Sequence, residues 1–147
     1  MEYHHTQTGT TIIVVLAIAI ILTLAIALNT GTMDPPVFAT LILLGAFLIL
    51  FHSLTVQINN GLLECRFGMG LIHKRIPLDK IQQVKKITNH WCTGWGIRWM
   101  PGSGWLWNVS GFDAVELVLK NGKRFRIGTD EPEKLLRAIE NRLSQKP

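Results

Sequence analysis

The apolar stretch TTIIVVLAIAIILTLAIAL, residues 10–28, decides the fold, because it contains no charged residue, glycine or proline. A second run, VFATLILLGAFLILFHSL at residues 37–54, has His52 as its one ionisable side chain. At about 1.5 Å of rise per residue each run gives a helix of roughly 27–28 Å, close to the ~30 Å hydrocarbon core of a bilayer. Neither run has a polar face, and a chain of 147 residues cannot cover both. Residues 10–54 therefore predict a pair of transmembrane helices.

The eight residues between the two runs predict a tight turn at the membrane surface. Gly31 can end the first helix, and Asp34-Pro35-Pro36 is a typical start for the second. A linker of this length leaves room for a helical hairpin only, so the chain returns to the side from which it started.

Basic residues are confined to the second part of the chain, and this asymmetry predicts the orientation. All 15 Lys and Arg residues follow His52, whereas only Glu2 and Asp34 of the ten acidic residues precede it. By the positive-inside rule we expect a multi-pass protein of the inner cell membrane, with residues 55–147 and both termini in the cytoplasm.

Residues 1–9 are polar and predict a tail that is too short to fold. They contain no basic residue ahead of the apolar run and no small-residue cleavage site. A signal peptide normally has both features, so we expect the first helix to be retained.

Beyond the second helix the apolar period becomes two, which predicts a mainly-β domain over residues 55–147. Leu54, Val56 and Ile58 alternate with polar residues and follow the helix without a linker. Asn59-Asn60-Gly61 is a typical hairpin turn. Further strands are expected at residues 62–67, 71–77 and 84–89, with a connection of undefined structure at 80–84.

All five tryptophans lie between Trp91 and Trp107. A hairpin with its loop at residues 100–104 would pair aromatic and apolar residues across two strands on one face. Two interpretations stay open, an aromatic ladder in the core or an exposed surface that contacts a partner. The predicted pairs are Trp99 with Trp105, Ile97 with Trp107, and Trp95 with Val109.

The next hairpin can be registered from its apolar pattern. A three-residue loop at 120–122, with Gly122 in the left-handed region, keeps one face of both strands apolar. An amphipathic helix is expected from about residue 131 to 143, with Asp130 and Glu133 as a capping pair. The predicted strand pairs are Leu117 with Phe125, Val115 with Ile127, and Glu116 with Arg126.

The expected fold is thus a two-helix transmembrane hairpin at residues 10–54, followed by about seven antiparallel strands and a C-terminal helix that caps an open end. In this order the chain resembles the bacterial pleckstrin-homology-like (PH-like) membrane proteins over about residues 54 to 144. The matching segments are Arg75-Ile76-Pro77-Leu78, Gly96-Ile97-Arg98, Pro101-Gly102, Trp107-Asn108-Val109-Ser110-Gly111, Ala114-Val115-Glu116-Leu117, and Arg126-Ile127-Gly128-Thr129-Asp130 with Pro132.

The resemblance implies a PH-like fold on the cytoplasmic face, no cofactor, and association with membranes and often with further copies. The phosphoinositide site of eukaryotic PH domains does not carry over. That site uses basic residues in a long first hairpin loop, whereas the loop here is Asn59-Asn60-Gly61 alone.

Alternation of strand direction predicts which turns face the bilayer. If the first strand runs outward and the order is up-and-down, the turns at 68–70, 90–94 and 110–112 come back towards lipid, and those at 101–102 and 121–122 point away. Amphipathic aromatic and apolar side chains are favoured at the headgroup level. The predicted membrane-interface residues are Met69, Trp91, Trp95 and Phe112.

The positive charge of the domain is scattered over several strands. Nucleic acid is not expected as a partner, because the domain is tethered at a membrane whose inner surface is anionic. General attraction to lipid headgroups is the simpler interpretation, and a specific anion site is the alternative. The residues in question are Lys74, Arg75, Lys85, Lys86, Arg124 and Arg126.

No catalytic or metal-binding motif is visible. A phosphate-binding glycine loop and a Gly-x-Ser-x-Gly elbow are both missing, and Cys65 and Cys92 lack a Cys-x-x-Cys partner. We therefore expect no enzyme and no cofactor. The predicted function is a membrane-anchored interaction module that binds other membrane proteins or copies of itself, with a binder of lipid headgroups or small anions as the alternative.

Overall fold

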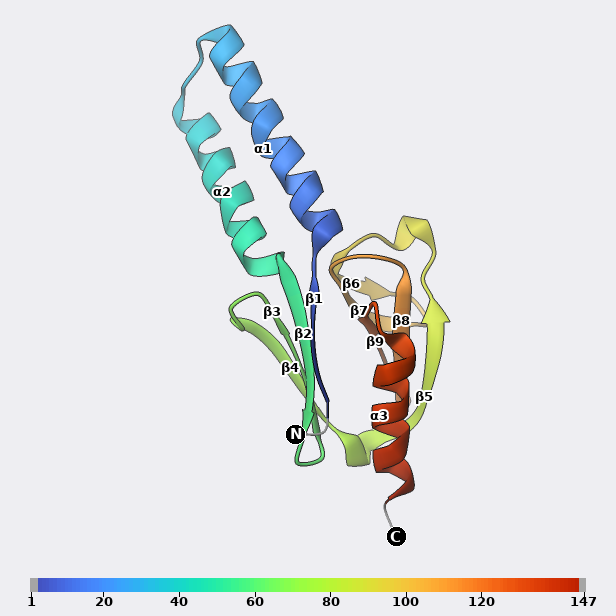
Figure 1. Cartoon of the computed structure of the whole chain (residues 1–147). Coiled ribbons are helices and arrows are strands. Elements are labelled where there is room, and N and C mark those ends of the chain that lie inside the picture. Colours follow the sequence, from blue (N-terminus) through green and yellow to red (C-terminus); the bar gives the residue numbers. More distant parts are fainter. Residues whose placement is uncertain (1–2, 146–147) are drawn as a thin grey trace.

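The computed structural model describes residues 3–145, in which a helical hairpin projects from one end of a β domain (Figure 1). The hairpin consists of α1 (Thr10–Thr30) and α2 (Pro35–Phe51), which pack against each other. Gly31 ends α1 in the left-handed conformation, and two prolines start α2, as predicted. One helix, α1, is long and apolar enough to cross a membrane, and α2 is a shorter apolar helix.

The β domain contains two sheets. The first sheet has the order β1-β2-β3-β4 and is antiparallel throughout. The second has the order β5-β8-β9-β7-β6. The strands are β1 (Tyr3–Thr8), β2 (Ser53–Asn59), β3 (Leu62–Phe67), β4 (Ile72–Pro77), β5 (Ile81–Thr88), β6 (Gly96–Met100), β7 (Gly104–Asn108), β8 (Asp113–Leu119) and β9 (Arg124–Gly128).

The two sheets and α3 (Pro132–Ser144) share one hydrophobic core. Apolar residues alternate along β2, β3, β8 and β9, so each sheet turns one face inwards. Helix α3 packs against β5 and β8 and buries Leu135 and Ile139. The coarse prediction, two apolar helices followed by a mainly-β domain and a C-terminal helix, is confirmed.

The registers of the β8–β9 and β6–β7 hairpins agree with those predicted from the sequence at all but one pair. The pairs Leu117↔Phe125, Val115↔Ile127 and Glu116↔Arg126 form as predicted, and Gly122 has φ of 81°. In the preceding hairpin Trp99 pairs with Trp105, and Ile97 pairs with Trp107. Trp95 lies before the start of β6, so its predicted partnership with Val109 does not form.

Four expectations are wrong. Residues 1–9 were expected to be too short to fold, but Tyr3–Thr8 forms β1, because the free edge of β2 supplies hydrogen-bonding partners that a short tail lacks by itself. The described residues form nine strands instead of about seven. Residues 81–84, expected as part of a connection, belong to β5 and extend the strand that was expected at 84–89.

The third expectation was an up-and-down antiparallel order. Strand β9 instead inserts between β8 and β7 and runs parallel to β7. The fourth was a capping pair of Asp130 and Glu133. The N-cap position is Glu131, which has no side-chain capping bond, and its backbone N–H donates to Thr129 Oγ1 at 3.1 Å.

The helices continue directly into the first sheet. Gly9 alone separates β1 from α1, and His52 alone separates α2 from β2. The Gly9 N–H donates to the His52 carbonyl at 2.7 Å, and Thr8 pairs with Ser53 in the sheet. A Cβ on Gly9 would lie 2.9 Å from the Phe51 carbonyl oxygen, so the two segments meet at a distance that suits glycine.

A column of aromatic rings extends the domain core into the hairpin. Ring centroids are 5.8 Å apart for Phe47 and Phe51, 5.1 Å for Phe51 and Phe67, 5.0 Å for Phe67 and Trp107, and 5.7 Å for Trp107 and Phe125. Such contacts add about 0.5–1.5 kcal/mol each beyond burial. The last turn of α2 is therefore packed on the β domain as well as joined to it.

A first prediction concerns Gly128, which lies against the side chain of Asn108. A Cβ at this position would lie 2.1 Å from Asn108 Oδ1, so Gly128→Ala is expected to destabilise the domain by about 1–3 kcal/mol. Unfolding in urea, followed by tryptophan fluorescence, measures the effect. Gly45→Ala is the control, because a Cβ there meets nothing within 4 Å. Equal stability of the two variants would contradict the prediction.

Candidate membrane-proximal site

Two turns of the β domain lie against the helix roots, by which we mean the first turns of α1 (residues 10–16) and the last turns of α2 (residues 47–51). The N–H of Gly68 donates to the Ser53 carbonyl at 2.9 Å, and a Cβ on Gly68 would lie 2.6 Å from the carbonyl oxygen of Ile49 in α2. On the other side the hydroxyls of Ser110 and Thr11 lie 3.0 Å apart. The turns at 68–70 and 110–112 therefore lie at the helix end of the domain, where the alternation of strand direction predicted them.

Asn108 shapes the second of these turns. Its Nδ2 donates to the Gly111 carbonyl at 3.0 Å, and its Oδ1 accepts from the Ser110 N–H at 3.3 Å. Gln7 Nε2 donates to the Ser110 carbonyl at 3.1 Å, which connects the same turn to β1. The turn is thus fixed to both the domain and the start of α1.

Several apolar side chains at the helix end of the domain are open to solvent. Met69 is 72% exposed, Trp91 73% and Phe112 44%, and all three are predicted membrane-interface residues. Leu71, at 71%, was not among the predicted residues, because its position before β4 was interpreted as part of a strand. Trp95, the fourth predicted residue, is half-buried.

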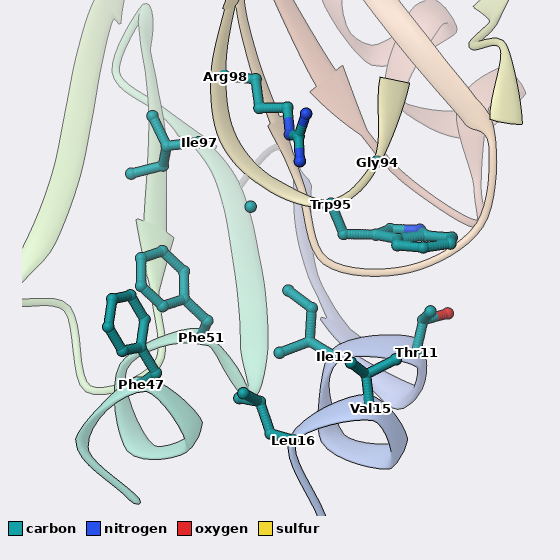
Figure 2. A pocket seen from close by; sticks show the side chains of 11 residues that line it. Thr11, Ile12, Val15, Leu16, Phe47, Phe51, Gly94, Trp95, Ile97 and Arg98 are labelled. Atoms are coloured by element: carbon teal, nitrogen blue, oxygen red, sulfur yellow. The ribbon is translucent and has the colours of Figure 1, made fainter. Parts of the chain in front are cut away.

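A groove of about 520 Å³ opens beside the helix roots (Figure 2). Its helix side is apolar, with Ile12, Val15 and Leu16 from α1 and Phe47 and Phe51 from α2. Its domain side consists of the segment from Gly94 to Arg98. The groove could not be predicted from the sequence, since no local pattern indicates that residues 11–16, 47–51 and 94–98 meet.

Trp95 forms a fixed wall of the groove. Its indole Nε1 donates to the Gly111 carbonyl at 3.1 Å, and its ring centroid lies 6.1 Å from that of Phe112. Arg98 lies on the domain side and turns its guanidinium towards the groove (Figure 2). Within residues 3–145, no carboxylate pairs with this guanidinium.

The predicted aromatic ladder divides between core and surface. Trp107 is 7% exposed and belongs to the core, whereas Trp99 is 61% exposed and Trp105 45%. These two exposed residues are cross-strand partners on β6, an edge strand of the second sheet, and its neighbour β7. The ladder therefore lies partly in the core and partly on the surface.

Three of the six candidate basic residues gather around one carboxylate. Glu116 has a fully buried side chain, and its two carboxylate oxygens lie 3.1 Å from Lys85 Nζ, 3.7 Å from Arg124 Nη1 and 2.7 Å from Arg126 Nε. Arg126 also donates to Ser103 Oγ at 3.0 Å. This group connects β5, β8 and β9 across the outer face of the second sheet.

The other three candidates lie apart from one another. Arg75 pairs with Glu64 at 2.9 Å, and Lys86 pairs with Glu133 on α3. Lys74 Nζ lies 4.6 Å from the centroid of the Phe125 ring, and partial burial lowers its pKa. The six basic residues do not form one open site.

The chain matches no family model, no curated protein and no solved structure.

The two cysteines differ in their surroundings. Burial raises the pKa of the Cys65 thiol to about 12, so this thiol stays protonated at neutral pH. Exposed Cys92 has its Sγ 3.1 Å from His90 Nδ1. Among the residues that the structure describes, no three His, Cys, Asp or Glu side chains are placed to hold a metal ion.

Glu116 has the clearest electrostatic role. Burial acts to raise the pKa of its carboxyl, but the hydrogen bond from Arg126 and the nearby charge of Lys85 outweigh this effect, and the pKa falls below its ordinary value of 4.5. A carboxylate whose pKa is lowered by folding stabilises the folded state at pH values above its unfolded-state pKa. This contribution is lost as the pH falls through the lower, folded-state pKa.

Glu116→Gln is therefore expected to destabilise the domain by about 1.5–3 kcal/mol at pH 7, because three cations lose their counter-charge. The difference from wild type should shrink as the pH falls below the ordinary carboxyl pKa of 4.5 and through the lowered folded-state pKa, since wild-type Glu116 then becomes neutral as well. Urea unfolding at a series of pH values measures this, with the exposed Glu140→Gln as control. A difference that does not depend on pH would rule out the charge as the cause.

Proposed function

We propose that this chain is a non-enzymatic, membrane-anchored PH-like interaction module that binds protein partners and copies of itself at the inner face of the membrane. Exposed indoles at an open sheet edge carry the proposal, because they are the features best suited to contact another protein. Trp99 and Trp105 are cross-strand partners there, and tryptophan is enriched among the residues that dominate interface energies.

Anchoring through both helices is supported by their length and surroundings. At about 1.5 Å per residue α1 is roughly 31 Å long and α2 roughly 25 Å, against a hydrocarbon core of ~30 Å. Most large apolar side chains of α1 and several of α2 are exposed, as lipid-facing residues would be. The basic residues, all after His52, favour a cytoplasmic β domain.

The order of elements in residues 53–144 supports a PH-like domain. Two sheets share a core with a C-terminal helix, in line with the resemblance carried by the sequence segments. Direct continuity of α1 with β1 and of α2 with β2 would hold this domain at a fixed distance from the bilayer. A module held in this way presents the same surface to every partner in the membrane plane.

Strand β6 is well placed for association. It has a neighbour, β7, on one side only, so its other edge has backbone groups available to a further strand. Within the membrane, Gly45 on α2 has open space around it, and Thr40 and Ala46 are exposed small residues nearby. Close approach of a second helix at small residues is a common mode of association in lipid.

The alternative function, an anion binder on the basic face, has weaker support. Five of its six candidate residues already pair with carboxylates of the same domain, and the sixth lies over an aromatic ring. A lipid or anion would have to displace these pairs, so the interaction module remains the preferred function.

Cysteine labelling tests the orientation. Cys92 is exposed and should react with a membrane-impermeant thiol reagent only after spheroplasts are lysed, whereas buried Cys65 should need denaturation. Met33→Cys in a Cys92→Ser background is the control, because this exposed residue in the α1–α2 turn should react without lysis. Labelling of Cys92 in unlysed spheroplasts would reverse the proposed orientation.

The double substitution Trp99→Ala with Trp105→Ala tests the contact surface. Because both indoles are exposed, folding should change little, while self-association should weaken about tenfold or more through loss of two interface aromatics. Cross-linking in native membranes and the mass of the detergent-extracted complex measure this. Trp91→Ala, at a more exposed indole that lies outside β6 and β7, is the control. Unchanged cross-linking in the double variant would exclude this surface.

A further inference from the structure

We propose that the groove beside the helix roots binds one anionic phospholipid of the surrounding membrane, with its phosphate on Arg98 and an acyl chain against α1 and α2. This site is separate from the Trp99–Trp105 surface and includes none of Lys74, Arg75, Lys85, Lys86, Arg124 and Arg126. It rests on the proposed function only in requiring that α1 and α2 lie in a bilayer.

Charge selects the headgroup. Arg98 is exposed at the domain side of the groove, and its guanidinium points into the open space (Figure 2). In contrast to Arg126 and Arg75, it pairs with no carboxylate of residues 3–145. A guanidinium recognises a phosphate by charge and by paired N–H donors, so an anionic group is its natural complement.

The opposite side of the groove matches an acyl chain. Ile12, Val15, Leu16 and Phe47 supply only hydrocarbon, and Val15 is 55% exposed. From Thr11 to Leu16 the helix rises about 8 Å, so the groove begins near the helix root and extends into the depth of the hydrocarbon core. One molecule that carries both a phosphate and an acyl chain fits this order of groups.

The groove is also largely formed in advance. A Cβ on Gly94 would lie 3.0 Å from Arg98 Cζ, so the glycine lets the guanidinium lie close to the loop. Trp95 is held in place by its hydrogen bond to Gly111. Lipid is the occupant we favour over a second protein copy, because the exposed faces of both apolar helices are continuous with the groove and meet acyl chains first.

Native mass spectrometry of the full chain in mild detergent tests the proposal. Phosphatidylglycerol and phosphatidylcholine with identical acyl chains are the probes. Wild type should retain phosphatidylglycerol in preference, and Arg98→Gln should lower its retention about threefold to tenfold. Arg137→Gln, which removes the same charge from an exposed position on α3, should leave retention unchanged.

A second pair of variants tests the acyl-chain side without a change of charge. Val15→Phe fills the groove and should reduce retention of phosphatidylglycerol, whereas Val14→Phe changes a neighbouring exposed residue that does not line it. Tryptophan fluorescence confirms that each variant is folded.

Several outcomes would overturn the proposal. These are equal retention of the two lipids by wild type, full retention by both Arg98→Gln and Val15→Phe, or loss of self-association without loss of lipid in Val15→Phe. If the chain nevertheless stays in the membrane after a carbonate wash, any of these outcomes contradicts the lipid site alone and not the membrane anchoring. Release of the chain by carbonate would instead contradict the proposed function itself.

Discussion

The hydrogen bond from the Gly9 N–H to the His52 carbonyl marks the constraint on which the rest of the structure depends. Two adjacent strands, β1 and β2, continue into two adjacent apolar helices with a single residue between strand and helix in each case. The hairpin can therefore leave the domain only at one end of the first sheet. The turns at 68–70 and 110–112 are placed next to the helix roots by the same constraint.

Packing extends this connection beyond the backbone. Phe47 and Phe51 in the last turns of α2 continue the aromatic contacts of Phe67, Trp107 and Phe125 in the domain. Because a rigid aromatic side chain loses little conformational freedom on burial, such contacts favour a single orientation of one element on another. The groove beside Arg98 exists because hairpin and domain are held together in this way, with α1, α2 and the segment before β6 around a common space.

Most of the candidate basic residues of the β domain form ion pairs within the domain itself. Glu116 stands on the outer face of the second sheet, where Lys85 and Arg126 are its cross-strand neighbours. Burial of a carboxylate is costly unless it is paired, and here three cations surround it. Much of the apparent basic surface is thus committed to internal pairs, and Arg98 differs from those residues in facing open space.

The sequence by itself determined the two apolar helices, the Asn59–Gly61 turn and the register of β8 and β9. These features depend on neighbouring residues, namely the period of apolar side chains and a glycine in the left-handed region, so they can be predicted from a short window. Only the tertiary structure decided that Tyr3–Thr8 joins a sheet, that β9 lies between β8 and β7, that Trp107 is buried while Trp99 and Trp105 are not, and that Arg98 faces the helix roots. Each of these depends on which strand edge or helix surface remains free after distant segments have packed, and no local pattern in the chain carries that information.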